Sequence, residues 1–176
     1  MTRLEVLDDA VKIGLGAAIT LVGVLATNHH QRKREFQNRR MDVIQKGANE
    51  FQKASEVFIQ FYAAYAAYLL PRIQSNAEAR DLAWEKVFQI MMNDISPALL
   101  SMISLEASLT VVGAKKSAKL IADFRSHATA VQSMAVPSDG GSEKAPSLQQ
   151  FGDTWNKAEK SSKVVFDALE SDYRAS

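Results

Sequence analysis

The three histidines are the first residues to consider as metal ligands or proton carriers: His29, His30 and His127. Neighbouring residues on a helix point about 100° apart, so His29 and His30 do not hold one ion between them. Neither a Glu-x-x-His nor a His-Glu-x-x-His pattern occurs, which argues against di-iron and zincin sites. The chain also has no cysteine, which excludes thiolate metal sites and a cysteine nucleophile. We therefore predict no metal and no cofactor.

Phosphate binding and acid–base catalysis have no better support. Lys115 and Lys116 precede a serine, but the two glycines of a phosphate-binding loop are missing. A solvated basic turn is the preferred interpretation, with an anion or lipid-headgroup contact as the alternative. The carboxylates Asp167, Glu170 and Asp172 fall on the polar side or at the end of the last expected helix, where they favour solubility. We predict no catalytic residue and a protein that is not an enzyme.

The composition indicates an all-helical fold. The chain has 176 residues, of which 47% are hydrophobic, so it is not a disordered polymer and has material for a core. Its 8 glycines and 4 prolines are too few for an all-β protein rich in turns. The predicted fold is all-α: a single N-terminal transmembrane helix, then a long heptad helix and an up-and-down helical bundle.

Residues 10–27, AVKIGLGAAITLVGVLAT, form the least polar stretch of the chain. As a helix, these 18 residues extend about 27 Å, close to the ~30 Å of bilayer hydrocarbon. No charge occurs from Ile13 to Asn28, and apolar residues cover every face. We predict a membrane-spanning helix. The alternatives are a cleavable signal peptide and a buried helix of a soluble bundle.

A basic juxtamembrane segment, residues 28–43, follows the expected span. We expect its five basic residues to contact anionic headgroups, at about 1 kcal/mol each near the surface: Arg32, Lys33, Arg34, Arg39 and Arg40. Basic residues beside a span mark its cytoplasmic side. We therefore expect residues 1–9 outside and 44–176 as a cytoplasmic body on the plasma (inner) membrane. Nucleic acid is the weaker interpretation of the same residues, and we predict no nucleic-acid partner.

Small residues form a strip within the expected span. Gly16, Thr20 and Gly23 are spaced by four and three positions, which lets helix backbones approach closely in lipid. We expect association between helices in the membrane along this strip, in a homo-oligomer or with other protein subunits. Ordinary membrane-helix composition is the alternative.

A heptad pattern begins behind the basic segment. Seven-residue spacing links one row of residues: Ile44, Phe51, Phe58 and Tyr65. A second row is offset by three: Gly47, Ala54, Phe61 and Tyr68. The pattern predicts one long helix over residues 28–70 with a buried seam, ended by Pro71.

Five aromatic residues near the end of this helix have two interpretations: Phe58, Phe61, Tyr62, Tyr65 and Tyr68. As part of the bundle core they need no further function. As a partner or membrane-interface surface they would exploit the apolar body and polar tip of tyrosine.

Four further helices are expected. Ser75 or Asn76 caps the second, whose apolar stripe is Trp84, Val87, Phe88, Met91 and Ile95. We expect a new helix to start at Ser96-Pro97, with Leu99, Leu100 and Ile103 on one side. Another helix covers 114–135, and residues 137–146 read as a mobile loop. A Ser147–Gln150 capping box opens the last helix, which extends to Tyr173.

The expected function is that of a single-pass membrane-anchored helical protein acting by protein–protein interaction. Such a protein is a scaffold, an adaptor, or a membrane-bound sensor or effector subunit. A membrane-perturbing toxin, immunity or pore-type protein acting through its N-terminal helix is the first alternative. A soluble or exported helical bundle without a span is the second.

Overall fold

A computed structural model describes residues 3–135 and 146–175, with side chains from Thr27 onward except that of His29. Seven helical segments and no strand make up the secondary structure of these residues, which confirms the predicted all-α class. The chain divides into two compact units, Met1–Arg40 and Met41–Ser176. The second unit is a helical bundle.

The long first helix, α1 (Arg3–Tyr68), contains the predicted heptad seam. All four residues of the first row are at most 3% exposed: Ile44, Phe51, Phe58 and Tyr65. In the second row Gly47, Ala54 and Phe61 are buried and Tyr68 is half-buried. The helix ends two residues before the predicted position, and Pro71 starts a short helix, α2 (Pro71–Gln74).

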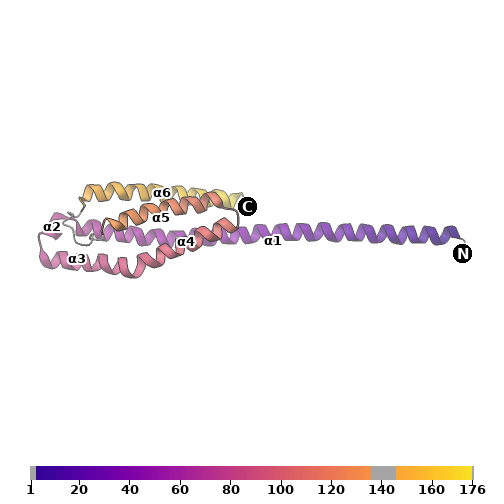
Figure 1. Cartoon of the computed structure of the whole chain (residues 1–176), viewed down its shortest axis with the longest axis horizontal. Helices are drawn as coiled ribbons and strands as arrows, with labels where there is room; N and C mark the ends of the chain where they lie inside the picture. The colour runs from indigo at the N-terminus through magenta and orange to yellow at the C-terminus, as the bar shows by residue number, and fades with distance from the viewer. Residues whose placement is uncertain (1–2, 136–145, 176) are drawn as a thin grey trace. The chain divides into compact units, whose positions relative to one another are not determined.

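Helix α3 (Ala77–Ile90) begins at the predicted Asn76 cap, whose side chain accepts a hydrogen bond from the Ala79 N–H at 3.1 Å. A new α-helix begins at the predicted Ser96-Pro97, but no break precedes it and Ser96 is not a cap. A π-helical turn, η1 (Met91–Ile95), leads directly into α4 (Ser96–Val111), and Ser96 has helical φ and ψ of −62° and −46°. Pro97 has no N–H to donate to the carbonyl oxygen of Asn93, and its ring crowds that carbonyl. The wider π turn relieves the crowding, so α3, η1 and α4 form one bent helical rod (Figure 1).

Gly113 ends the rod by letting the chain leave the helical conformation. Its φ is +82°, a conformation that glycine adopts without a Cβ penalty. The Gly113 N–H bonds to the Thr110 carbonyl and the Ala114 N–H to the Leu109 carbonyl, the two bonds of a Schellman motif. The chain then turns back into α5 (Lys115–Ser133).

The last helix, α6 (Leu148–Arg174), opens with the predicted capping box. Ser147 Oγ accepts from the Gln150 N–H at 3.1 Å, and Gln150 Oε1 accepts from the Ser147 N–H at 3.0 Å. The middle of its predicted stripe is buried, but the two ends are not, since Leu148 is 41% exposed and Tyr173 is 44% exposed.

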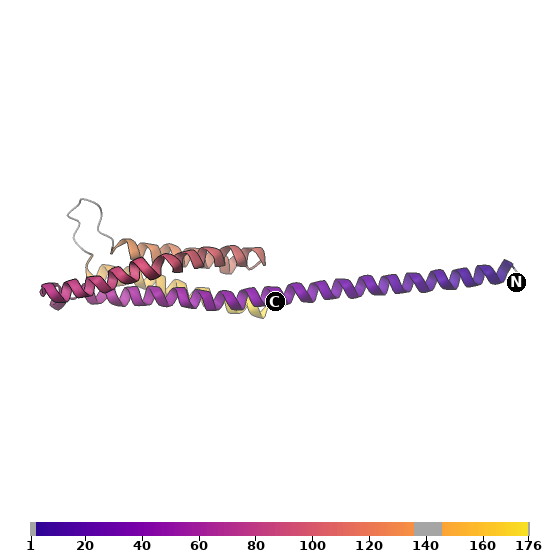
Figure 2. The same ribbon diagram turned by 90° about the horizontal axis from the view of Figure 1, so that it is seen from below.

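Within the second unit, α1 from Met41, the α3–η1–α4 rod, α5 and α6 run in alternating directions (Figures 1 and 2). The Phe51 ring lies 5.0 Å from that of Phe124 on α5 and 5.1 Å from that of Phe166 on α6. Met102 and Leu109 of α4 are fully buried in the same core. Each rod therefore contributes an inner face to one shared core.

Several predictions fall on residues that the structure does not describe. No helix of the part with described side chains is long and apolar enough to cross a membrane. The predicted span at 10–27 lies outside that part except for Thr27, as does its strip of Gly16, Thr20 and Gly23. The predicted loop at 137–146 also lies outside, except for Pro146. These three stay predictions.

Candidate functional site

The basic segment places its cations around one aromatic side chain. Phe36 is 57% exposed on α1. Residues three and four positions away on a helix share a face, and those positions around Phe36 are all basic: Arg32, Lys33, Arg39 and Arg40. All of these are exposed except Arg40, which is half-buried, and Arg34 is also exposed. We call these five basic residues and Phe36 the basic patch.

The five aromatic residues near the end of α1 lie in the core. Phe58, Phe61 and Tyr65 are at most 3% exposed. Tyr62 is half-buried and stacks on Trp155 of α6, with ring centroids 4.7 Å apart. Tyr68 is half-buried beside Trp84, at a centroid distance of 5.3 Å.

The Tyr65 hydroxyl donates to the Met134 carbonyl oxygen at 3.3 Å. Burial, together with the nearby Tyr68, raises the pKa of Tyr65 to about 12. The hydroxyl is therefore a neutral donor at any physiological pH, with the geometry of a packing contact.

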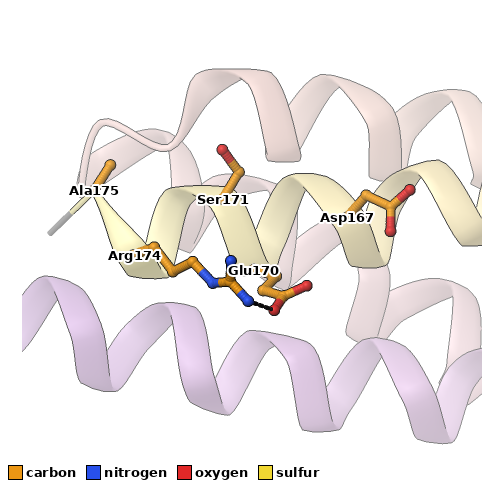
Figure 3. Close-up of a pocket in the computed structure, with 5 residues that line it drawn as sticks. All are labelled: Asp167, Glu170, Ser171, Arg174 and Ala175. Carbon is orange, nitrogen blue, oxygen red and sulfur yellow. Dashed lines mark hydrogen bonds and ion pairs between the residues drawn. The ribbon is translucent and has the colours of Figure 1, made fainter.

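A shallow pocket of about 380 Å³ lies at the end of α6 (Figure 3). The Arg174 side chain extends back along the helix and pairs with Glu170, while Ser171 points away from that pair. The pair is exposed and local to one helix, a geometry that stabilises the helix end weakly.

Asp172 has a different role from the one that the sequence indicated. It is half-buried, and its Oδ2 accepts a hydrogen bond at 2.5 Å from Ser117, which is fully buried on α5. This contact joins α5 to α6, so Asp172 is a packing residue as well as a solubility residue. The long sequence separation of the pair hides it from any local pattern.

A polar groove of about 480 Å³ runs between α5 and α6 beside His127. Asp123 lies one helical turn before the histidine, and Lys157 and Lys160 line the opposite side. The buried Nδ1 of His127 has no hydrogen-bond partner in the described part of the chain. No group of three or more potential metal ligands forms among the residues described. The groove thus offers charge without an arranged catalytic set.

A second groove, of about 410 Å³, lies between α1 and α6 and is largely apolar. Ile44 and Ala48 line it from α1, and Phe166, Leu169 and Tyr173 from α6. Its exposed lining residues are Gln45, Asp167, Glu170 and Tyr173. The groove is shallow and holds no polar pair of the kind that activates a nucleophile.

The most unusual surface lies on the side of the α3–η1–α4 rod that faces away from the core. Six exposed apolar residues recur there at helical spacing: Phe88, Met92, Leu100, Ile103, Ala107 and Val111. Leu100 is 67% exposed and Val111 83% exposed. We call these six residues the outer face.

The sequence identified Phe88, Leu100 and Ile103 as apolar helix positions but did not indicate that they would be exposed. The buried side of α4 is formed by other residues, among them Met102, Leu105 and Leu109, so α4 is apolar on two opposite sides. The available signal was the near absence of charge in this helix. Its single charged residue is Glu106.

Glu106 is itself occupied by a contact within the bundle. Its carboxylate accepts from Arg125 Nε at 2.7 Å and from Arg125 Nη2 at 3.2 Å. This forked hydrogen bond raises the pKa of the Arg125 guanidinium above its ordinary value. The outer face therefore carries no free charge along α4.

Comparison with known proteins found no match: no family model, no curated protein and no solved structure matches the chain.

Proposed function

We propose that this protein is a membrane-anchored helical protein that acts by protein–protein interaction and not by catalysis. The observation that supports it is the outer face, a row of exposed apolar side chains on a helix almost without charge. Contiguous apolar surface of this kind marks sites where a protein meets a partner. Large exposed residues such as Leu100 and Val111 lower the free energy of the system when another surface removes them from water.

The packing of the bundle explains why this surface is available for binding. Met102, Leu105 and Leu109 already supply the contribution of α4 to the core. The bundle therefore does not need Leu100 or Val111 for its own folding. Side chains that are apolar, exposed and unnecessary for the core are suited to a docking function.

The membrane anchor is the second part of the proposal. It is supported by the uncharged run from Ile13 to Asn28 and by the basic patch directly behind it. Exposed cations around Phe36 suit a headgroup layer, since an aromatic ring favours the membrane interface and cations favour anionic lipid. The positive-inside rule orients the bundle toward the cytoplasm, on the inner membrane.

Photo-crosslinking in native membranes tests the docking function. A photoreactive amino acid at Leu100, on the outer face, should give a discrete crosslinked product that contains this protein. The same amino acid at Lys163, an exposed position on α6, is the matched control and should give none. Equal products from both positions, or none from either, would argue against the proposal.

Extraction at alkaline pH tests the anchor. The natural chain should stay in the membrane pellet, because a spanning helix resists extraction. Leu21→Arg places a charge inside the expected span at a cost of roughly 2.5–3.5 kcal/mol, so this variant should shift to the supernatant. Leu4→Arg lies outside the expected span and should stay in the pellet. A natural chain that is released completely would contradict the anchor and leave the docking function untouched.

A further inference from the structure

The absence of free charge on α4 restricts what can cover the outer face. Between Ser96 and Gly113 the single charged side chain is Glu106, and Arg125 already pairs with it. A partner that brought charged groups would have to bury them without counter-ions, which is costly. A second copy of the same face brings none.

We infer that the α4 part of the outer face, from Leu100 to Val111, packs antiparallel against the same part of a second copy, about a two-fold axis that passes between Ile103 and Ser104. This inference rests on the proposed function, because it names the partner of the surface described there. A two-fold interface requires one self-complementary patch, so residues at equal distances on either side of the axis must fit each other.

Side-chain sizes along α4 meet that requirement. With this axis, Leu100 lies opposite the second copy's Ala107, a large residue against a small one. Ser96 at the start of α4 lies opposite the second copy's Val111 at its end. Interdigitation of large with small residues allows two helices to approach at the 8–10 Å that is usual for packed pairs.

Two of the hydroxyl groups beside this row do not oppose burial. Ser108 donates to the Ser104 carbonyl oxygen at 2.9 Å, and Thr110 donates to the Glu106 carbonyl oxygen at 2.7 Å. Both hydroxyls bond within their own helix, so a covering surface need not supply an acceptor for either of them.

Charges beyond the two ends of α4 select the antiparallel arrangement. Asp94 is exposed at the η1 end, and Lys115 and Lys116 are exposed just beyond the other end. Antiparallel packing brings the acidic end of one copy to the basic end of the other. Parallel packing would place like charges together, which is unfavourable across an interface.

Cysteine crosslinking of the full chain in native membranes or lipid nanodiscs tests the inference. The natural sequence has no cysteine, so every link comes from an introduced residue. Under mild oxidation Ser104→Cys should form a disulfide-linked dimer, because this position lies beside the axis. Val164→Cys, exposed on α6, is the control and should stay monomeric.

Direction is tested by a mixed pair. Ser96→Cys and Val111→Cys, both exposed on α4, lie at equal distances from the axis, so chains carrying one should link to chains carrying the other. Neither variant alone should form dimers. Parallel packing predicts the reverse, with Ser96→Cys linking to itself, and this result would overturn the inference.

Charge reversal gives a measurement that does not depend on a disulfide. Lys115→Glu with Lys116→Glu should raise the dissociation constant of the dimer at least tenfold. Adding Asp94→Lys should restore most of the lost affinity. A natural chain that is monomeric in nanodiscs, with Ser104→Cys unlinked, would overturn the inference. If Leu100 then still crosslinked to a different protein, the proposed function would stand. If it crosslinked to lipid or to nothing, both would fail.

Discussion

Helices α4 and α6 belong to the same bundle but differ in their outward sides. Helix α6 carries nine charged residues in 27 positions, and its exposed side is a solvated polar surface. Helix α4 carries one charged residue in 16 positions, and its exposed side is apolar. Both helices bury an inner row of residues. The fold therefore requires the inner rows alone, and the difference between the outer sides must have another cause.

We propose that this cause is a partner. Apolar residues that contribute to folding are identified by their burial, and the exposed row of α4 fails this criterion along its whole length. On α6 the large exposed aliphatic residues are Leu148, at the first position of the helix, and Val164, which lie far apart. Isolated exposed residues of this kind are ordinary in proteins. A row of them is not.

Truncating one side chain on each side of α4 should give the largest difference in stability. Met102→Ala removes a fully buried side chain and should lower the free energy of unfolding by about 2–5 kcal/mol. Leu100→Ala removes a side chain that is 67% exposed and should cost less than about 1 kcal/mol. Urea unfolding of both variants, at concentrations where the midpoint does not depend on protein concentration, measures the difference. Equal costs would place Leu100 in the core and remove the basis of the outer face.

Alkaline pH should lower the free energy of unfolding of the bundle through ionisation of Tyr65. Its pKa of about 12 in the folded protein lies above the ordinary value of 10.0. Between these values the unfolded chain loses its proton first, so stability is complete below pH 10 and falls as pH rises toward 12. The loss reaches about 2–3 kcal/mol. Unfolding curves from pH 9 to 12 measure it, and Tyr65→Phe should flatten the decline. An unchanged decline in that variant would assign the effect to other groups.

The contact that joins α6 to α5 should have a smaller effect. Ser117→Ala removes the buried donor to Asp172 and should cost about 1–2 kcal/mol, since the acceptor is charged and half-buried. Asp172→Asn keeps an acceptor oxygen and should cost less. Thermal unfolding compares the two. No loss in Ser117→Ala would mean that water replaces the hydroxyl.

The ion pair that joins Glu106 on α4 to Arg125 on α5 should have the smallest effect on stability. Glu106 and Arg125 are each partly exposed, so their ion pair should contribute about 1 kcal/mol. A double-mutant cycle with Glu106→Gln and Arg125→Met measures the coupling, which should fall further at high salt. A coupling near zero would leave Glu106 as an unpaired charge beside the outer face, and the absence of free charge on α4 would no longer hold.

Sequence periodicity was sufficient to predict the buried row of α1. Seven-residue spacing located Ile44, Phe51, Phe58 and Tyr65, and the capping box located the start of α6. Local patterns of this kind depend on the helix itself, so they can be predicted without knowledge of the tertiary structure.

Other features depend on contacts between helices and were missed for that reason. The bond from Ser117 to Asp172 joins residues 55 positions apart. The π turn that accommodates Pro97 replaces the break that Ser96-Pro97 predicted locally. On α4, two apolar sides gave no indication of which one would be buried, so the exposure of Leu100 could not be predicted.

Accessibility of position 100 in native membranes tests the central claim most directly. In the full chain, which otherwise lacks cysteine, single cysteines at Leu100 and at Lys163 are treated with a hydrophilic maleimide on inverted vesicles. Leu100→Cys should react at least tenfold more slowly than Lys163→Cys, and both should react equally after denaturation. Equal rates in the native membrane would show the outer face open to water, and the claim that it is a docking surface would be wrong.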